Sequence, residues 1–384
     1  MHLLKQKIEQ LSTVDIGYYD KNFIQELSEN VSRDIVTQNA LDRLIQLYEK
    51  SGFLYPAKKE RISPYMDLIL DNWKAALNMD GQLLNIVTFK GKSSTKEQLT
   101  SITFWRTTFN SWVAQHLVST GFPVGVCAMM LRAQAEVNVE RHRYKSFQNW
   151  FSESNKYANM VFGTLVRTIG KEHSCVNAYA YVAVKNIVKH PSQIIKIIPY
   201  QDDLHDAVYQ LYCKIRGTID AEAEEINDMD IELDQLDQLY EKVGLRRKRY
   251  IWLAMMNNQS QPVGMAVVNR APFGLNFSIL ENRCDLLVDS GLIDSVREII
   301  CKNLMVSIHE AYFGNNIDLP YPVSFVPVIT DMKCANILTK SGAELMRIYN
   351  KSIWMQQAFE GWYTHIQKTY EAFLIRRKNK LKIK

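Results

Sequence analysis

The sequence repeats one order of strand and helix patterns at an interval of about 170 residues. In each half, a run of strand-like segments ends in a glycine-containing turn, and a helix, a strand, a helix and a last strand follow. Two pairs of landmarks recur in this order: Val118 and Gly121 as Val288 and Gly291, then Ala158 and Asn159 as Ala335 and Asn336. A repeat of this length can bury a core of its own, so it indicates two similar domains in tandem.

The strand-like segments are rich in β-branched and aromatic residues, and the helical segments have apolar residues every three or four positions. In the first half, strands are predicted at 83–90, 101–109, 111–119, 146–152 and 175–184. Helices are predicted from residue 1 to about 50, with the apolar period at 41–48, and at 62–77, 123–139 and 155–168. In the second half, strands are predicted at 194–200, 249–256, 262–268, 281–289, 323–329 and 347–355, and helices at 202–216, 295–312 and from 332.

These patterns predict an α+β fold with two mixed-sheet domains. With 384 residues, of which 47% are hydrophobic, the chain is long enough for two cores. The predicted parts are an N-terminal helical extension (1–33), domain 1 (34–190), domain 2 (191–356) and a C-terminal basic helical tail (357–384). The polar segment 186–193 is the expected linker.

The spacing of the cysteines and the hydropathy of the sequence indicate the cellular compartment and whether a metal site is to be expected. The six cysteines are far apart and form no CxxC pair, so neither a zinc site nor a dense disulfide framework is indicated. No run approaches the roughly 20 apolar residues of a membrane span. We therefore expect a cytoplasmic protein without a metal.

The positive charge is concentrated in the tail. Between Lys368 and Lys384 there are seven basic residues and one acidic residue, against a net charge of +5 for the whole chain. No basic footprint extends over the rest, so nucleic acid is not a clear partner. Weak contact of the tail with a membrane or RNA is one interpretation, and a solvated chain end is the other.

Both halves carry motifs that resemble the GCN5-related N-acetyltransferase (GNAT) superfamily. The strand-turn-helix junctions at 111–125 and 282–295 have the family's order of elements. The family's late signature is roughly Asn-x-x-Ala-x-x-Leu-Tyr-x-Lys-x-Gly-Phe. The matching positions are Asn155 and Ala158 in the first copy, and Ala335, Leu338 and, after a one-residue gap, Lys340 and Gly342 in the second. LYEKSGF (47–53) matches better but has no room for an upstream core, so we interpret it as a helix end closed by Gly52.

The resemblance implies an N-acyltransferase that uses acetyl-CoA or another acyl-CoA as substrate and a small-molecule or lysine amine as acceptor. In the family, main-chain amides at a helix N-terminus hold the pyrophosphate, where unpaired donors favour an anion. The corresponding cofactor-binding positions are Val118, Ser119, Gly121, Val124, Gly125 and Asn159 in the first half and Val288, Gly291 and Asn336 in the second. The second turn carries Asp289 and Asp294, whose charges oppose a pyrophosphate, so the first half is the better candidate.

The predicted catalytic base lies in the second half, although the first half is the better candidate to bind the cofactor. The 170-residue offset places Asp285 opposite Gln115, and we predict Asp285 as the catalytic base because an amide cannot accept the proton. Strand alternation is expected to turn His116 to the other face. The tyrosine that often donates a proton in this family is replaced by Phe162 in the first half and about Thr339 in the second.

One stretch of the second half is strongly acidic. Nine acids and no base lie between Asp220 and Asp237. As a wall of the acceptor site, they would suit a cationic acceptor; otherwise, they form a solvated loop. The sequence therefore leaves two functions open: an acyl-CoA-dependent N-acyltransferase, or a binding or regulatory protein that kept the double fold and lost catalysis.

Overall fold

The computed structural model describes residues 34–35, 40–92, 97–140, 142–185, 192–257, 259–314 and 319–382. The predicted N-terminal extension (1–33) and most of the expected linker lie outside these residues. In the part described, no helix is both long enough and apolar enough to cross a membrane.

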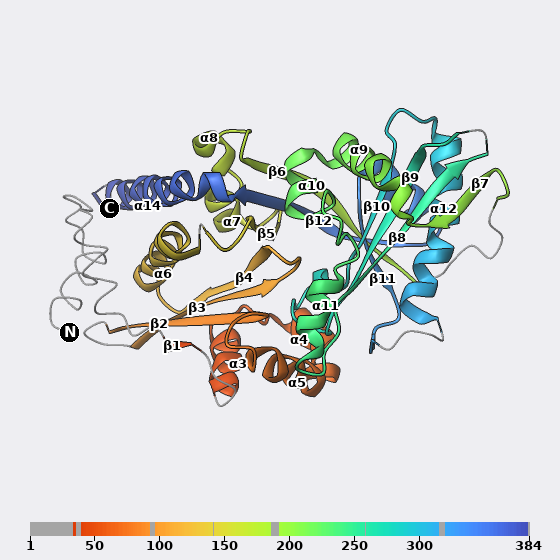
Figure 1. The fold of residues 1–384 in the computed structure, drawn as a ribbon. Coiled ribbons are helices and arrows are strands. Elements are labelled where there is room, and N and C mark those ends of the chain that lie inside the picture. The colour runs from red at the N-terminus through yellow and green to blue at the C-terminus, as the bar shows by residue number, and fades with distance from the viewer. Residues whose placement is uncertain are drawn as a thin grey trace.

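The described strands form one mixed sheet with the order β1-β2-β3-β4-β5-β12-β6-β11-β10-β9-β8-β7 (Figure 1). Their bounds are β1 Asp34–Ile35, β2 Leu84–Lys92, β3 Glu97–Arg106, β4 Ser111–Ser119, β5 Ser146–Ser152, β6 Ser174–Val184, β7 Ile195–Pro199, β8 Lys248–Met256, β9 Pro262–Arg270, β10 Cys284–Val288, β11 Val326–Thr330 and β12 Glu344–Met355. Most pairs are antiparallel, but β4 with β5 and β10 with β11 are parallel. The predicted α+β class with a mixed sheet is confirmed.

Helices lie on both faces of the sheet (Figure 1). The α-helices are α3 Leu41–Lys50, α4 Pro56–Ile62, α5 Met66–Leu77, α6 Phe122–Ala135, α7 Lys156–Val161, α8 Leu165–Ile169, α9 His205–Arg216, α10 Thr218–Ala223, α11 Asp234–Glu241, α12 Asp294–Phe313, α13 Met332–Lys340 and α14 Phe359–Lys382. A π-helical turn, Glu136–Glu140, continues α6. The predicted strands and helices occur in the predicted order, but α4, α10 and α11 are additional helices that the predicted ranges do not include.

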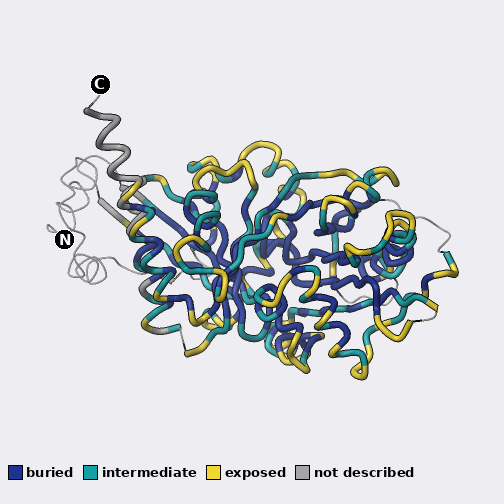
Figure 2. Tube along the Cα trace, turned by 90° about the horizontal axis from the view of Figure 1, so that it is seen from above, coloured by how far each residue is buried: buried dark blue, intermediate teal, exposed yellow. Residues whose placement is uncertain are grey.

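Alternation along the strands of the first half separates two cores. Val87, Phe104 and Ala114 point toward α6, α7, α8 and α14, and the neighbouring Ile86 and Val113 point toward α3, α4 and α5. We call these two sides the α6 face and the α5 face. In the second half, α12 and α13 cover one face and α9 and α10 the other. The sheet between them is buried along most of its length (Figure 2).

The last strands of the two halves are exchanged. β6, which ends the first half, lies between β12 and β11 of the second half. β12, which ends the second half, lies between β5 and β6 of the first. Each half therefore completes its sheet with a strand of the other, so that backbone hydrogen bonds join them across the middle of the molecule.

The helix predicted at 155–168 is interrupted. α7 ends at Val161 and α8 begins at Leu165. The amides of Phe162 and Gly163 both donate to the carbonyl of Ala158, which closes the first helix, and a Cβ at Gly163 would lie 2.7 Å from the Asn159 carbonyl oxygen. The helix end predicted at Gly52 is confirmed, since Gly52 has a positive φ of 74° after α3.

Candidate functional site

The parallel strands β4 and β5 pair and then part. Their register runs from Ser111 with Ser146 to Ala114 with Asn149, although β4 continues to Ser119 and β5 to Ser152. Beyond this point the facing edges have no strand between them. The Asn149 side chain donates to the Ala114 carbonyl oxygen (2.7 Å) where the strands part. The parting leaves main-chain groups on both edges outside the ladder, where a ligand can bind them.

A β-bulge lies on β4 at the start of this gap. The pairing with β3 shifts between Ser101 and Thr103, and His116 has a positive φ of 49°. As a result, Gln115 and His116 both point to the α5 face, where Gln115 Nε2 donates to the Leu275 carbonyl oxygen (2.5 Å). The prediction that strand alternation turns His116 to the face opposite Gln115 was therefore wrong, because the extra residue of the bulge shifts the alternation by one position.

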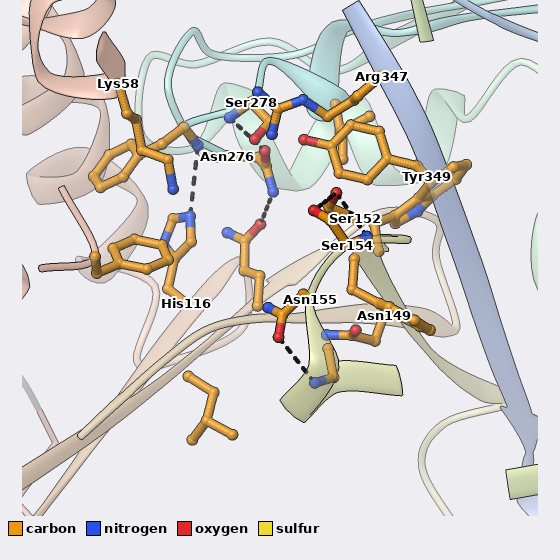
Figure 3. A pocket seen from close by; sticks show the side chains of 18 of the residues that line it. Lys58, His116, Asn149, Ser152, Ser154, Asn155, Asn276, Ser278, Arg347 and Tyr349 are labelled. Carbon is orange, nitrogen blue, oxygen red and sulfur yellow. Dashed lines mark hydrogen bonds between the residues drawn. The ribbon is translucent and has the colours of Figure 1, made fainter. Parts of the chain in front are cut away.

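A cavity of about 650 Å³ opens where the two strands part (Figure 3). Its lining comes from five places in the chain: the α3–α4 turn, β4, β5 with α7, a loop after β9, and the start of β12. The polar and charged side chains include Lys58, Gln115, His116, Asn149, Ser152, Ser154, Asn155, Asn276, Ser278, Arg347 and Tyr349. The sequence motifs identified β4 and α7, whereas the other segments reach the site through tertiary contacts.

A loop of the second half closes the cavity on the α5 face. Residues 271–282 leave β9 and pack against α5, since Asn72 Nδ2 donates to the Phe273 carbonyl and Trp73 Nε1 to the Gly274 carbonyl, each at 2.9 Å. Asn276 Nδ2 then donates to Gln115 Oε1 (2.5 Å). We call residues 271–282 the crossing loop, and it makes the cavity a joint product of both halves.

Two cations lie at one end of the cavity, and no carboxylate is among its described lining residues. Lys58 Nζ lies 3.9 Å from the centre of the Phe53 ring, and Arg347 donates to the Tyr55 hydroxyl (3.5 Å). Burial, with Arg347 and Arg61 nearby, lowers the pKa of Lys58 to about 8. Figure 3 shows both cations at the end where Asn276 and Ser278 also lie. The electrostatics of this end favour an anion.

His116 is buried and uncharged. Burial first, and then the charge of Lys58, lowers its pKa well below the usual range. The ring stacks on Phe277 with centroids 4.6 Å apart, and Nε2 accepts from the Phe277 amide at 3.5 Å. Nδ1 has no hydrogen-bond partner among the described residues. The imidazole is therefore a neutral and buried part of the cavity wall.

The turn predicted to hold a pyrophosphate follows β4 on the α6 face. Gly121 is the N-cap of α6 and has no side chain to cap the helix amides, while its own amide donates to Ser119 Oγ at 3.3 Å. Gly125 is buried, and a Cβ there would lie 3.2 Å from Ser119 Oγ. Val118 is buried on the α5 face, and Val124 lies in the first turn of α6. Of the predicted first-half positions, Ser119, Gly121, Val124 and Gly125 thus form one helix start.

The NKYANM segment contributes a different residue from the predicted one. Asn155, the N-cap of α7, lines the cavity and accepts the Ala158 amide (3.1 Å). Asn159 instead donates to the carbonyls of Glu153 and Asn155, at 2.6 and 2.9 Å, and so braces the turn. The spacing Asn155-x-x-Ala158 is typical of an N-cap residue and the amide that it accepts. The sequence could therefore have indicated that Asn155 caps α7. Phe162, where a tyrosine was expected, lines the cavity and stacks on Trp362 (5.6 Å).

Asp285 lies in the second half, away from this cavity. It is buried, and its carboxylate accepts from Arg283 Nε at 2.9 Å and Arg216 Nη2 at 3.5 Å. Arg283 also binds Glu224, which binds Lys351 of β12 at 2.6 Å. These contacts place Asp285 in a buried ion network beneath the crossing loop. Its role as catalytic base stays a prediction.

The second-half turn is bound by the protein's own groups. The Gly291 amide donates to Asp289 Oδ1 (2.9 Å), and Asp289 also pairs with Lys214 at 2.7 Å. Arg297 on α12 joins the Asp289 carbonyl oxygen to Asp331, the N-cap of α13. Val288 is buried in the core beneath, and Asn336 is exposed on α13. A cavity of about 270 Å³, lined in part by Arg216 and Asp331, lies where β10 and β11 part.

The acidic stretch is neither a solvated loop throughout nor an exposed acidic wall. Asp220, Glu224, Glu225 and Asp237 are buried. Lys351 pairs with Asp220 (2.8 Å) and Glu224 (2.6 Å), and Asp237 binds Arg246 and Lys248, each at 2.7 Å. Burial raises the pKa of Glu224, but Arg283 and Lys351 outweigh it and hold that pKa well below the usual range. The solvated-loop interpretation was wrong for these four residues, because basic side chains or main-chain amides elsewhere in the fold bind them.

Comparisons with known proteins give matches at low identity among solved structures alone. No family model matches the sequence, and no curated protein is significantly similar to it. Among solved structures, a tandem GNAT protein from the clavulanic acid biosynthesis pathway is 10% identical with a TM-score of 0.38, over 85% of this chain and 99% of that one. A Pyrococcus horikoshii protein described provisionally as an acetyltransferase is 8% identical with a TM-score of 0.41, over 89% and 92%. A GNAT-family acetyltransferase from Colwellia psychrerythraea is 9% identical with a TM-score of 0.32, over 85% and 99%.

Matches with TM-scores of 0.32 to 0.41 carry no argument about this chain's backbone or about any side chain of the cavity. What this chain does is therefore inferred from its own geometry.

Proposed function

We propose that the protein is an acyl-CoA-dependent N-acyltransferase whose reaction takes place in the first half. The observation that supports this most directly is the parting of β4 and β5 beside a 650 Å³ cavity. An extended acyl-CoA arm carries amide donors and acceptors and can bind the freed strand edges as an added strand would. The turn at Gly121 leads into α6 from the same place. The Gly121 amide donates to Ser119 Oγ and Pro123 has no amide hydrogen, so the amides of Phe122 and Val124 are the candidates to bind the pyrophosphate.

The two substrates are assigned to opposite faces of the sheet. The Gly121 turn lies on the α6 face, whereas Lys58 and the crossing loop lie on the α5 face. We assign the acyl-CoA to the α6 face and the amine acceptor to the α5 face, so that they meet in the gap. The amine attacks the thioester carbonyl, and the carbon–sulfur bond breaks to release the CoA thiol. Main-chain amides of the bulge near His116 are the candidates to stabilise the oxyanion.

The cavity where the second-half strands β10 and β11 part is smaller, at about 270 Å³. Its turn amide at Gly291 is already bound by Asp289, and the place where β10 and β11 part holds the network of Arg216 and Asp285. We propose that this half serves as a scaffold that supplies β12 and the crossing loop.

The test is acyl-CoA binding by calorimetry, together with release of CoA thiol in the presence of amines. Ser154 is exposed at the cavity lining, so Ser154→Trp adds bulk at the mouth and is expected to weaken acetyl-CoA binding at least tenfold. Ser154→Ala is the matched variant without bulk. Ile293→Trp places the same side chain at the exposed second-half turn, where Ile293 is 68% exposed, and is expected to change nothing. If Ile293→Trp weakens acetyl-CoA binding and Ser154→Trp does not, the acyl-CoA site lies in the second half.

Asp285→Asn separates catalysis from structure. Loss of turnover with unchanged stability is the outcome required of a catalytic base. The ion pairs with Arg283 and Arg216 favour the other outcome, in which the free energy of unfolding falls by about 3–5 kcal/mol and the turnover of folded protein is kept. Chemical denaturation and thiol release on the same preparation decide between them.

A second candidate function is acyl-CoA binding without transfer. It is favoured by Phe162, since no hydroxyl is present where the family's proton donor is expected. Tight acetyl-CoA binding without thiol release, across a panel of primary amines, is the result that this function requires.

A further inference from the structure

The cation end of the cavity has no matching anion in the protein. Lys58 and Arg347 come from α4 and β12, almost 290 residues apart, and meet at one end. The contacts of Lys58 are the rings of Phe53 and Tyr55, and those of Arg347 are the Tyr55 hydroxyl and the Tyr349 ring at 5.6 Å. Within the described residues, no ion pair joins either cation to a carboxylate.

The contrast with the second half makes this end distinctive. There, the buried cations Arg216, Arg283 and Lys351 have carboxylate partners within 3.5 Å, whereas Arg247 and Arg270 donate to main-chain carbonyls. Lys58 and Arg347 are both half-buried, and like charges at one end of a cavity repel each other unless an anion lies between them. Burial first, and then the charge of Arg347, lowers the pKa of Lys58.

These cations are on the wrong side of the sheet for the pyrophosphate. The α4 helix packs with α3 and α5, and the Gly121 turn opens α6 on the opposite face. Groups that donate hydrogen bonds lie beside the cations, including the Asn276 amide and the Ser278 hydroxyl. A charged group held by a guanidinium and an ammonium, with neutral donors around it, has the environment that a carboxylate or phosphate prefers.

We propose that the acceptor amine carries an anionic group, a carboxylate or a phosphate, and that Lys58 and Arg347 bind this group. The acceptor class is thus amino acids, or amines with a phosphate, in place of polyamines. The reaction of such an acceptor rests on the proposed acyl transfer, but its binding does not.

The test uses full-length protein and acceptors in matched pairs that differ in the anion alone. The pairs are amino acids with their amides, such as lysine with lysinamide and glutamine with its amide, and phosphoethanolamine with ethanolamine. Calorimetry without acyl-CoA measures binding, and thiol release with acetyl-CoA measures transfer. At least one anionic member is expected to bind tenfold or more tightly than its partner, and the two kinds of pair distinguish a carboxylate from a phosphate site.

Variants locate the preference. Arg347→Gln and Lys58→Gln are each expected to reduce the ratio of acid to amide affinity about tenfold, and Arg347→Glu to reverse it. Lys196→Gln, an exposed cation on β7 at the far edge of the sheet, removes the same charge and is expected to leave the ratio unchanged. Circular dichroism and denaturation confirm that each variant is folded.

The proposal is overturned if no anionic member binds better than its partner in wild-type protein, or if folded Arg347→Gln and Lys58→Gln keep the wild-type ratio. Failure of acetyl-CoA to bind or to release thiol contradicts the proposed function but not this inference. The ratio of acid to amide affinity then still decides whether Lys58 and Arg347 bind an anionic group of the acceptor.

Discussion

Charged side chains that are buried or half-buried in this protein lie in three different settings. In the second half, Glu224 is surrounded by Arg249, Arg283 and Lys351 at 3.3, 2.7 and 2.6 Å, so the charges compensate one another. At the cavity, Lys58 and Arg347 have aromatic and hydroxyl contacts instead. A compensated network favours a structural role, and an uncompensated pair of cations favours a ligand.

Glu281 in the crossing loop is a third setting, a buried acid beside main-chain amides. Its Oε1 accepts the Gly274 amide (2.7 Å), and burial raises the pKa of the carboxyl to about 8, although several hydrogen bonds oppose the shift. The folded state therefore keeps the proton more tightly than the unfolded state. The stabilisation from this group is complete below the ordinary pKa of about 4.5 and is lost as the pH rises to about 8.

Glu281→Gln tests this linkage, since glutamine keeps an oxygen for the Gly274 amide and cannot titrate. Wild-type protein is expected to lose up to about 1.4 kcal/mol of unfolding free energy per pH unit from this group between pH 5 and 8. The variant loses that part of the slope, as measured by urea denaturation at pH 5.5 and 7.5. Identical slopes in both proteins would show that Glu281 does not titrate in this range.

At the scale of elements, the crossing loop connects the second half to the cavity of the first. It is buried along almost its whole length and carries hydrogen bonds to α5 and β4. Gly274 has a positive φ of 85°, and a Cβ there would lie 2.2 Å from Ile69 Cγ1. The close approach of loop and helix therefore requires glycine.

Gly274→Ala is expected to destabilise the protein by about 2–4 kcal/mol, from left-handed strain and overlap with Ile69. Gly244→Ala is the matched control, because Gly244 has a φ of 71° and no atom within 4 Å of its Cβ position. The control is expected to lose about 1–2 kcal/mol in chemical denaturation. Equal losses would mean that Ile69 moves aside at no cost.

At the scale of the whole molecule, the exchange of β6 and β12 joins the halves. β6 pairs with two strands of the second half, and β12 pairs with β5 and β6 of the first. Lys351 of β12 is in turn held by Asp220 and Glu224 on the α10 side. The halves are therefore expected to depend on each other for a complete sheet.

A protease site inserted at 188–189 tests this dependence. After cleavage, the fragments 1–188 and 189–384 are expected to elute together in size-exclusion chromatography and to unfold in one transition, because each contributes a central strand to the other. Separation of the fragments without denaturant would contradict the exchange. Uncleaved protein with the same insertion is the control.

The sequence by itself determined the elements and their order. Strand and helix periods come from local side-chain alternation, so β5 at Ser146–Ser152 and β4 at Ser111–Ser119 were predicted to the residue. The repeat indicated two similar halves, and the glycine-containing turns distinguished the first half from the acidic second one. Asp285, Asn159 and Asn336 were assigned from the spacing of residues, which cannot show what a side chain contacts.

Tertiary structure alone decided which residues meet at the cavity. Lys58, Asn276 and Arg347 are far apart in sequence and come together because the crossing loop folds back and β12 is exchanged. The bulge at His116 also depends on pairing with β3, which no local period reveals. Long-range pairing of strands fixes register and facing side chains, and for that reason the chemistry of the site is a property of the assembled sheet.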